Sequence, residues 1–412
     1  MSALSDGPLT GLRVLDLTRV LAGPSAAQVL GDLGADVVKV ERPGAGDDTR
    51  GWGPPFVKDA EGRETQESAY YLCANRNKRS VAVDIATEAG AELVRRLADR
   101  ADVVMENFKV GDLDRRGLGW AALSARNPRL VFCSITGFGQ DGPYAARAGY
   151  DFMIQGLGGI MSVTGEPDGP PQKVGVGIAD IMTGMYAVAA ILAALRAREI
   201  TGRGQRIDMA LFDTQLSWLA NQGLAYLTDG RTPQRLGNAH PTIVPYEAYP
   251  AADGWFILAV GNDGQFARFC AAAGRPELAA EPAFARNRDR VLNRERLTPQ
   301  IRALTATRTT AEWLALLAPL GVPCGPVNDI AQAFADPQAV HRGARVRQPH
   351  PTAAGGTVDT IASPMRLSET PVTYRRAPPT VGQHTGEVLA EAGYRPDEIA
   401  AMAAAGAVAG RL

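Results

Sequence analysis

The sequence has few cysteines, few histidines and almost no net charge. Its 412 residues include four cysteines and four histidines, and 43 basic residues balance 44 acidic ones to a formal charge of -1. This balance argues against a protein that binds nucleic acid by neutralising phosphates. No two cysteines have the spacing of a redox or zinc motif, so we expect reduced core thiols in a cytoplasmic protein. They are Cys73, Cys133, Cys270 and Cys324.

Long hydrophobic runs are also absent. The first residues, MSALSDGPLTGLRVLDL, lack the basic segment and following apolar run of a signal peptide. The longest apolar stretch, at about residues 185–195, is rich in alanine and shorter than the roughly 20 residues that a membrane span needs. We therefore expect a protein without a membrane partner.

What the sequence does contain is a regular alternation of short apolar runs and helix-like segments. Residues 11–41 predict one βαβ unit, with GLRVLDL and DVVKVE as its strands, and the alternation continues to about residue 139. It predicts an α/β fold with a parallel sheet and helices on its faces.

The pattern changes after about residue 210. A hairpin-like signal around the sequence ADG predicts antiparallel strands in a smaller α+β domain. Residues 337–382, rich in proline, glycine and arginine, predict extended chain with short strands, running either between domains or around a partner subunit.

The first βαβ unit raises the question of a dinucleotide site. Glu41 ends the second predicted strand, where a ribose-binding carboxylate would stand. The preceding turn holds only Gly23, followed by Pro24, and lacks the G-x-G-x-x-G that lets a pyrophosphate approach. An NAD-dependent oxidoreductase is therefore the weaker alternative, because Gly23 and Pro24 also suit a simple helix start.

Basic residues recur near the predicted strand ends. Each alone suits a solvated surface, but together they could hold a phosphate-bearing ligand of nucleotide size. They are Arg42, Arg76, Lys78, Arg79, Lys109 and Arg115.

Asp180 is the one acidic residue at the start of a long apolar helix, in VGVGIADIMTGMYAVAAILAAL. Two interpretations are open. Aspartate is a favoured N-cap residue, because its side chain accepts a hydrogen bond from an unpaired helical N–H. Whether the carboxylate has a role beyond the cap is left to the rest of the chain, and the positive end of the helix is expected to keep it ionised at neutral pH.

Stretches spanning almost the whole chain resemble the class III CoA-transferase family, which includes formyl-CoA transferase, carnitine CoA-transferase and alpha-methylacyl-CoA racemase. In chain order they are LTGLRVLDLTRVLAGP, LGDLGADVVKVERPGAGDDTRGW, NRNKRSVAVDI, ADVVMENFKVGDLDRRGLGW, GYDFMIQGLGGIMSVTGEPDGPP, VGVGIADIMTGMYAVAAILAAL, TGRGQRIDMALFD, GNAHPTIVPYEAY, GVPCGPVND and GQHTGEVLAEAGY.

The resemblance implies a fold and an assembly. Residues 1–215 would form most of a large Rossmann-like domain that binds CoA, and residues 225–330 a small α+β domain. Residues 331–412 would form an extended connection and a C-terminal part that returns to the large domain. Two subunits would interlock as a homodimer.

The resemblance also implies site residues. The family's nucleophile falls on Asp180, which would form an acyl anhydride with an acyl-CoA thioester and then carry CoA as a thioester. CoA would be a substrate, with no tightly bound cofactor and no metal. Its contacts fall on Val20, Leu21, Ala22, Arg42, Val83, Asp84, Ile85, Ala86, Asn107, Phe108, Lys109 and Arg115.

Tyr150 separates two activities within the family. Racemases carry a histidine at the corresponding position, as an acid/base partner for the downstream aspartate. A phenol, with an ordinary pKa of about 10, is a poor base at neutral pH, so Tyr150 favours group transfer and would donate a hydrogen bond near the reacting carbonyl. An aromatic anchor for the loop is the other interpretation of Tyr150. His240, in GNAHPTIVPY, would contact the acyl group or order a turn.

The predicted function is transfer of CoA from an acyl-CoA thioester to a small free carboxylic acid. The region GNAHPTIVPYEAY resembles members that use succinyl-CoA and a dicarboxylic acid, whereas the glycine-rich run of formyl-CoA transferase is absent. A 2-methylacyl-CoA racemase and a non-catalytic acyl-CoA-binding paralogue are the alternatives.

Overall fold

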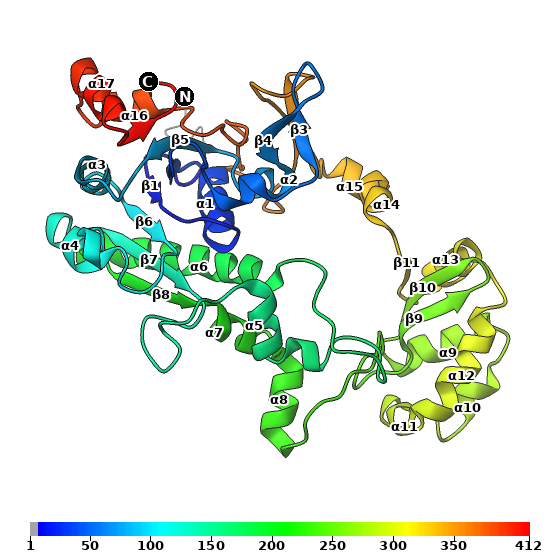
Figure 1. Cartoon of the computed structure of the whole chain (residues 1–412). Helices are drawn as coiled ribbons and strands as arrows, with labels where there is room; N and C mark the ends of the chain where they lie inside the picture. Colours follow the sequence, from blue (N-terminus) through cyan, green and yellow to red (C-terminus); the bar gives the residue numbers. More distant parts are fainter. Residues whose placement is uncertain (1–6) are drawn as a thin grey trace. The chain divides into compact units, whose positions relative to one another are not determined.

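The computed structural model describes residues 7–412, which divide into two compact units (Figure 1). Unit 1 takes in the chain up to Gly159, Val174–Ala220 and Gln338–Leu412. Unit 2 takes in Ile160–Lys173 and Asn221–Pro337. Residues 160–173 thus lie in unit 2, although they precede the predicted domain boundary at residue 215.

A seven-stranded sheet in the order β14-β5-β2-β1-β6-β7-β8 forms the centre of unit 1. Only the short edge strand β14 is antiparallel to its neighbour, so the predicted parallel sheet is confirmed. Counted among themselves, the parallel strands run in the order 3-2-1-4-5-6, which reverses direction between β1 and β6. The strands are β1 (Arg13–Asp16), β2 (Asp36–Glu41), β5 (Lys78–Val83), β6 (Val103–Glu106), β7 (Val131–Thr136), β8 (Arg206–Ala210) and β14 (Val408–Ala409).

Helices cover both faces of this sheet, because consecutive strand residues point to opposite sides. Val14 packs in one core with residues of α1 and α6, and Leu15 packs in the other core with residues of α3, α16 and α17. The helices of unit 1 are α1 (Ala22–Asp32), α2 (Ala69–Leu72), α3 (Glu88–Ala98), α4 (Trp120–Arg126), α5 (Asp151–Leu157), α6 (Ile178–Thr201), α7 (Leu211–Ser217), α16 (Thr385–Glu391) and α17 (Pro396–Ala404).

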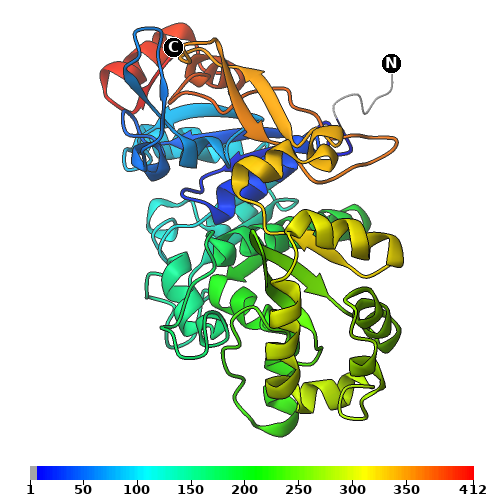
Figure 2. The same ribbon diagram turned by 90° about the vertical axis from the view of Figure 1, so that its right-hand side faces the viewer.

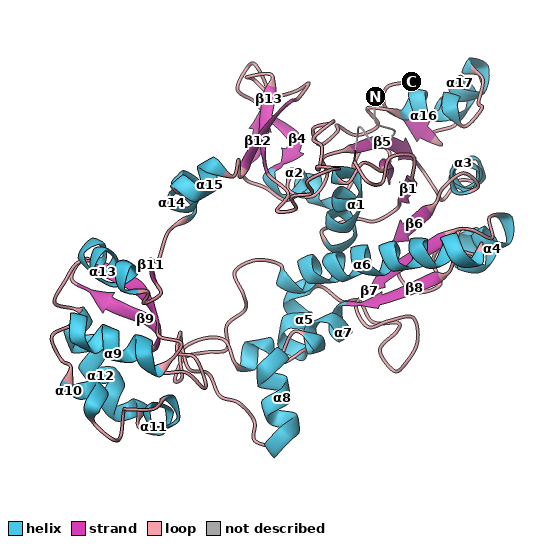
Figure 3. Ribbon diagram, turned by 180° about the vertical axis from the view of Figure 1, so that it is seen from behind, coloured by secondary structure: helices cyan, strands magenta, loops and turns pink. Residues whose placement is uncertain are grey.

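The longest helix, α6, corrects the prediction made for the apolar stretch at 185–195. It has 24 residues and is long and apolar enough, by length and composition alone, to cross a membrane. Instead it runs along α1, β7 and β8, with Ala187 and Ile191 fully buried (Figure 3). The contact with α1 is close, since a Cβ atom on Gly184 would lie 2.5 Å from the carbonyl oxygen of Ala22. Helix α6 is thus a core helix of unit 1.

Unit 2 contains a three-stranded antiparallel sheet in the order β11-β10-β9. The turn between β9 and β10 falls at Ala252 and Asp253, as the ADG signal predicts. Its core contains Phe256 stacked on Trp313, with ring centroids 6.1 Å apart. The elements from Ala220 to Pro337 are α8 (Ala220–Asp229), β9 (Tyr246–Ala251), β10 (Gly254–Ala259), α9 (Asp263–Ala272), α10 (Glu277–Ala280), α11 (Asn287–Leu292), α12 (Arg294–Thr305), α13 (Thr310–Leu317), β11 (Cys324–Pro326) and α14 (Ile330–Ala335).

Residues 337–382 form the predicted extended passage with short strands. After α15 (Pro337–His341), β12 (Arg345–Pro349) and β13 (Thr357–Ile361) pair as a hairpin, orange in Figure 2. The chain then packs on unit 1, where the carbonyl of Pro379 accepts hydrogen bonds from Arg50 and Tyr71. A second hairpin of unit 1 comprises β3 (Phe56–Lys58) and β4 (Glu64–Ser68).

The cysteines are all free thiols, and their burial differs from the prediction at one position. Cys133 and Cys270 are buried and Cys324 is half-buried. Cys73 is exposed, because it lies just after the four-residue helix α2 rather than within a strand or long helix.

Candidate active site

A cavity of about 400 Å³ lies in unit 1 at the carboxyl ends of β1, β6 and β7. These ends meet at one edge of a parallel sheet, and the cavity lies beside the point where the strand order reverses, the usual ligand position in such sheets. Of the predicted site residues, the following line it: Val20, Leu21, Ala22, Asn107, Phe108, Lys109, Tyr150 and Asp180.

Asp180 is the third residue of α6, and Gly177 holds the N-cap position. The cap comes instead from Asp151, the first residue of α5, whose Oδ1 accepts the backbone N–H of Ala179 at 2.8 Å and of Asp180 at 3.3 Å. Gln155 orients Asp151 by donating to its Oδ2 at 2.7 Å. The N-cap interpretation of Asp180 is therefore wrong, and its carboxyl group is left for another role.

The surroundings of the Asp180 carboxyl group favour its protonated form. The residue is only 8% exposed, and within residues 7–412 it makes no ion pair. Burial, and secondly the negative charge of Asp151, raise the pKa of Asp180 to about 7. Burial and the charge of Asp151 thus oppose the ionisation that the helix N-terminus was expected to favour at neutral pH.

The loop after β1 has an unusual backbone. Val20 has a φ of 73°, in the left-handed region that a β-branched residue rarely adopts and that costs about 1–3 kcal/mol. The Asp47 carboxylate accepts the Val20 N–H at 3.2 Å. On the other side, the Asn107 side chain accepts the N–H of Arg19 at 2.9 Å and donates to its carbonyl at 2.7 Å. The loop is thus held from two neighbouring strand ends.

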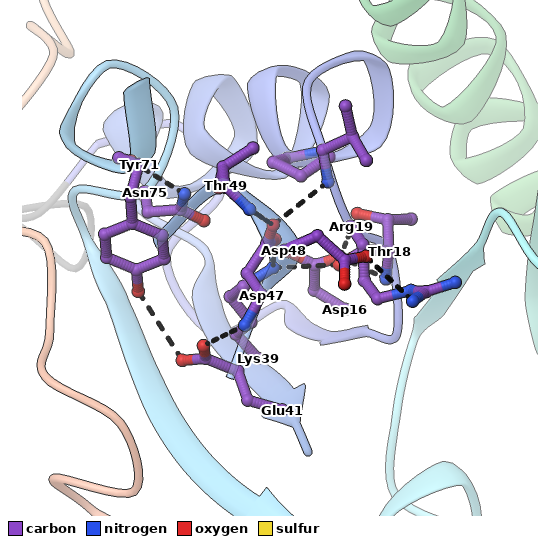
Figure 4. Close-up of polar contacts among 12 residues, drawn as sticks. Asp16, Thr18, Arg19, Lys39, Glu41, Asp47, Asp48, Thr49, Tyr71 and Asn75 are labelled. Atoms are coloured by element: carbon purple, nitrogen blue, oxygen red, sulfur yellow. Dashed lines mark hydrogen bonds and ion pairs between the residues drawn. The ribbon is translucent and has the colours of Figure 1, made fainter. Parts of the chain in front are cut away.

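A buried lysine supports the same loop (Figure 4). Lys39, in the middle of β2, donates from Nζ to the Thr18 carbonyl at 2.8 Å and to the Asp47 carboxylate at 2.9 Å. Both members of this ion pair are completely buried. Burial of a charged lysine costs desolvation free energy, which the hydrogen bonds and the ion pair with its two partners offset. These partners explain why a lysine stands between Val38 and Val40.

Cationic side chains stand at the rim of the cavity. Arg19 pairs with Asp48 at 2.9 Å and lies over the Phe108 ring. Arg42 does not line the cavity, but it also approaches Asp48, at 3.4 Å. The side chains of Arg19 and Arg42 are 37% and 58% exposed, so both arginines are accessible to an anionic ligand.

Other predicted CoA contacts lie outside the cavity lining. Val83 ends β5, and Asp84, Ile85 and Ala86 follow it at the same edge of the sheet. Arg115 lies beyond β6, on an exposed turn, where it pairs with Asp112.

Three of the basic residues assigned to a phosphate ligand are buried in ion pairs at the amino end of β5. Arg76 pairs with Asp32 at 2.6 Å, Lys78 with Asp16 at 3.0 Å and Arg79 with Asp36 at 2.6 Å. The prediction that they contribute to a phosphate site is therefore wrong.

Glu41 is likewise engaged. It is buried, accepts two hydrogen bonds from Arg50 and one from the hydroxyl of Ser80, and has no carboxylate oxygen left for a ribose. This removes the main feature that favoured a dinucleotide site. Among residues 7–412, no three acidic, cysteine or histidine side chains are grouped to hold a metal ion.

Tyr150 and His240 lie in different units. Tyr150 is the N-cap residue of α5 and is 64% exposed, at the cavity wall. His240, in unit 2, accepts the N–H of Thr242 through Nδ1 and packs on the Tyr246 ring, with centroids 5.1 Å apart. These contacts order a turn, and contact of His240 with an acyl group stays a prediction.

Sequence reasoning missed two side chains of the cavity region. Arg147 lines the cavity, and the signal that could have found it is a lone arginine in a glycine-rich loop between aromatic residues, FGQDGPYAARAGY. Asp47 was missed because its partner Lys39 looked like an ordinary strand residue.

Comparison with known proteins gives matches over nearly the whole chain. Residues 9–385 match the model of CoA-transferase family III. The chain is 52% identical to a succinate–glutarate CoA-transferase of Agrobacterium fabrum, over 93% of this chain and 95% of that protein. It is 43% identical to a succinyl-CoA:glutarate CoA-transferase of Mus musculus, over 93% and 86%. A crystal structure of a CAIB/BAIF family protein from Brucella suis matches with a TM-score of 0.83 and 51% identity, over 94% of this chain and all of that one.

Proposed function

The chain belongs to CoA-transferase family III, and we propose that it moves CoA from succinyl-CoA to a dicarboxylic acid such as glutarate, through a covalent intermediate on Asp180. The observation that carries the role of Asp180 is a buried carboxyl group that has no counter-ion within the described residues and faces a cavity. A buried titratable group of this kind in a cavity is typical of a reactive site. The two relatives named above support the choice of substrates.

The proposed reaction uses the same carboxylate twice. An Asp180 oxygen attacks the thioester carbonyl of the donor, the C–S bond breaks, and CoA leaves as a thiolate, which leaves the acyl group joined to Asp180 as a mixed anhydride. The thiolate then attacks the Asp180 carbonyl carbon, which releases the donor acid and leaves CoA as a thioester on Asp180. The acceptor carboxylate attacks this thioester, and the returning thiolate attacks the new acyl carbonyl, which regenerates Asp180 and gives the new acyl-CoA.

The ionised form of Asp180 is required for the first attack. With a pKa of about 7, a comparable share of each form is present at neutral pH, and the raised pKa makes the carboxylate a stronger nucleophile than an exposed aspartate. Tyr150, at the cavity wall, is proposed to donate its hydroxyl proton in a hydrogen bond to the reacting carbonyl oxygen.

CoA is proposed to lie along the carboxyl edge of the sheet. Residues 20–22 and 107–109 would contact its pantetheine arm and pyrophosphate, with Arg19 and Arg42 as phosphate partners that leave Asp48. The strand order supports a Rossmann-like description of unit 1. Val83 to Ala86, and Arg115, would then contact the nucleotide part.

A second copy of the chain is proposed to complete the protein as an interlocked homodimer in the cytoplasm. Exposed apolar side chains between β11 and β12 support this proposal, with Ile330 at 79% and Val340 at 64% exposure. Such side chains are more stable when a partner covers them. Light scattering on the purified protein would measure twice the chain mass of 43.6 kDa if the proposal holds.

The proposed function is tested by chromatography of acyl-CoA species. The wild-type protein, incubated with succinyl-CoA and glutarate, is expected to form glutaryl-CoA and succinate. Asp180→Ala should form none, whereas Glu199→Ala, an exposed acid near the other end of α6, should behave as the wild type. Transfer by Asp180→Ala, or no transfer by the wild-type protein, would contradict the proposal.

A further inference from the structure

The segment from Gly137 to Gly149 leaves β7 and returns to the start of α5 as a closed loop. A Cβ atom on Gly137 would lie 2.5 Å from the Gly149 Cα, and one on Gly149 would lie 2.4 Å from the Gly137 Cα. The two ends therefore touch backbone to backbone, which only glycine permits. The two ends of the loop, next to Tyr150, are thereby held against each other.

Aromatic side chains hold the loop in place. Phe138 meets Tyr144 edge to face, with ring centroids 5.4 Å apart, and packs on Phe212 of α7 at 5.8 Å. The Arg147 guanidinium group lies 4.4 Å from the centroid of Tyr144 and 5.3 Å from that of Phe138. A guanidinium group placed against rings keeps its charge and its N–H edges available for a ligand.

Arg147 is a cation of the cavity that has no acidic partner. The cavity lining contains five charged residues: Arg19, Asp48, Lys109, Arg147 and Asp180. Arg19 is paired with Asp48, whereas Arg147 makes no side-chain hydrogen bond or ion pair in the described chain. An unpaired guanidinium group that faces a cavity is suited to bidentate binding of a carboxylate.

Arg147 is joined through a short stretch of chain to the residues that contact the start of α6. Tyr150 follows three residues after Arg147, and the next residue, Asp151, accepts the backbone N–H of Asp180. The proposed CoA contacts instead follow β1 and β6, on the neighbouring strand ends.

We propose that Arg147 binds the distal carboxylate of the acyl group, and so selects dicarboxylic over monocarboxylic substrates. The inference rests on the proposed function. Donor and acceptor acyl groups are attached in turn to Asp180 and to CoA at one site, so one arginine would bind the free end of both. A succinyl and a glutaryl group differ by one methylene, and both present a carboxylate to the same guanidinium fork.

The test compares acceptors that differ only at the distal end. With succinyl-CoA as donor, kcat/KM is measured for glutarate and for pentanoate, in the wild type, Arg147→Met, Arg147→Lys and the control Arg196→Met. Arg196 is an exposed arginine on α6, outside the cavity lining. A second series replaces succinyl-CoA by butyryl-CoA with glutarate as acceptor, and thermal unfolding checks that each variant is folded.

Loss of a hydrogen-bonded charge pair predicts that Arg147→Met lowers kcat/KM for glutarate about 10- to 100-fold and leaves that for pentanoate nearly unchanged. Arg147→Lys, which keeps the charge without the fork, should lie between, and Arg196→Met should match the wild type. The inhibition constant of free CoA should not change.

An unchanged ratio of glutarate to pentanoate in folded Arg147→Met or Arg147→Lys would overturn the inference. So would an equal loss for both acceptors together with weaker inhibition by CoA, which would assign Arg147 to CoA. Absence of glutaryl-CoA in the wild-type reaction is a separate outcome, which overturns the proposed function and this inference with it.

Discussion

The carboxylate of Asp151 in α5 accepts the backbone N–H of Asp180 in α6 at 3.3 Å, so two acidic side chains lie at the first turn of α6. One acid caps the helix and is held by Gln155, and the other faces the cavity. Because the two negative charges are close, the capping acid also affects the proton affinity of its neighbour.

Asp151→Asn is expected to lower the pKa of Asp180 from about 7, because the second cause of its rise is removed while burial, the first cause, remains. The amide oxygen of asparagine can still accept the helix N–H groups, so the cap is kept. The pH dependence of kcat/KM checks this, and its acidic limb should move to lower pH. A limb that stays in place, or that moves equally in the exposed-acid control Asp168→Asn, would contradict the prediction.

Asp180→Asn is expected to stabilise the fold at alkaline pH. The Asp180 carboxyl group has a pKa of about 7 in the folded chain and an ordinary pKa of 3.8 in the unfolded chain. The free energy of unfolding therefore falls as pH rises between these two values. The penalty that the amide removes is at most about 4 kcal/mol at pH 8 and is smaller at pH 5. Urea unfolding of both proteins at the two pH values measures it, and a larger gain at pH 5 than at pH 8 would show that the sign is wrong.

Lys39→Met is expected to destabilise unit 1 by about 3–5 kcal/mol, because it leaves the completely buried Asp47 carboxylate without its cation. Replacing both partners, as in Lys39→Met with Asp47→Ala, should recover part of this loss. Denaturant unfolding followed by circular dichroism is the measurement, with the exposed Lys58→Met as a control. Equal stability of Lys39→Met and Lys58→Met would exclude a structural role for the pair.

Racemisation is not expected. Tyr150 stands at the start of α5 where a racemase would carry a histidine, and the described cavity lining contains no histidine that could pair with Asp180 in proton exchange. A 2-methylacyl-CoA that carries deuterium at the alpha carbon should keep it in water, as followed by mass spectrometry. Rapid washout by the wild-type protein, absent in Asp180→Ala, would support the racemase alternative instead.

The sheet and its ligand edge could be predicted, because buried parallel strands such as DVVKVE are short apolar runs between helix-like segments. The motifs also indicated the residues after β1 and β6 that line the cavity. The ion pairs of Arg76 and Lys78 could not be predicted. Their partners lie 44 and 62 residues away in the chain and meet them only through the strand order of the folded sheet.

The cap on α6 was hidden for a similar reason. Asp151 and Asp180 are 29 residues apart, and residues 160–173 between them belong to unit 2. Local sequence rules assign a cap to the residue next to the helix, and here they favoured the wrong aspartate. A structural role of Asp151, as a cap or a salt-bridge partner, could be predicted, but the helix that it caps could be found only once α5 and α6 were placed side by side.

The contact between Gly184 and the carbonyl of Ala22 has a consequence for protein engineering. It joins the first turn of α1, beside the proposed CoA loop, to the helix that carries Asp180, so these two parts pack directly on each other. The loop from Gly137 to Gly149 is attached at its ends, by its aromatic side chains, and by hydrogen bonds of Gln140 with Asp208 and Arg206 of β8. If Arg147 binds the distal carboxylate as proposed, acyl selectivity can be exchanged by redesigning this loop while the reactive centre remains as it is.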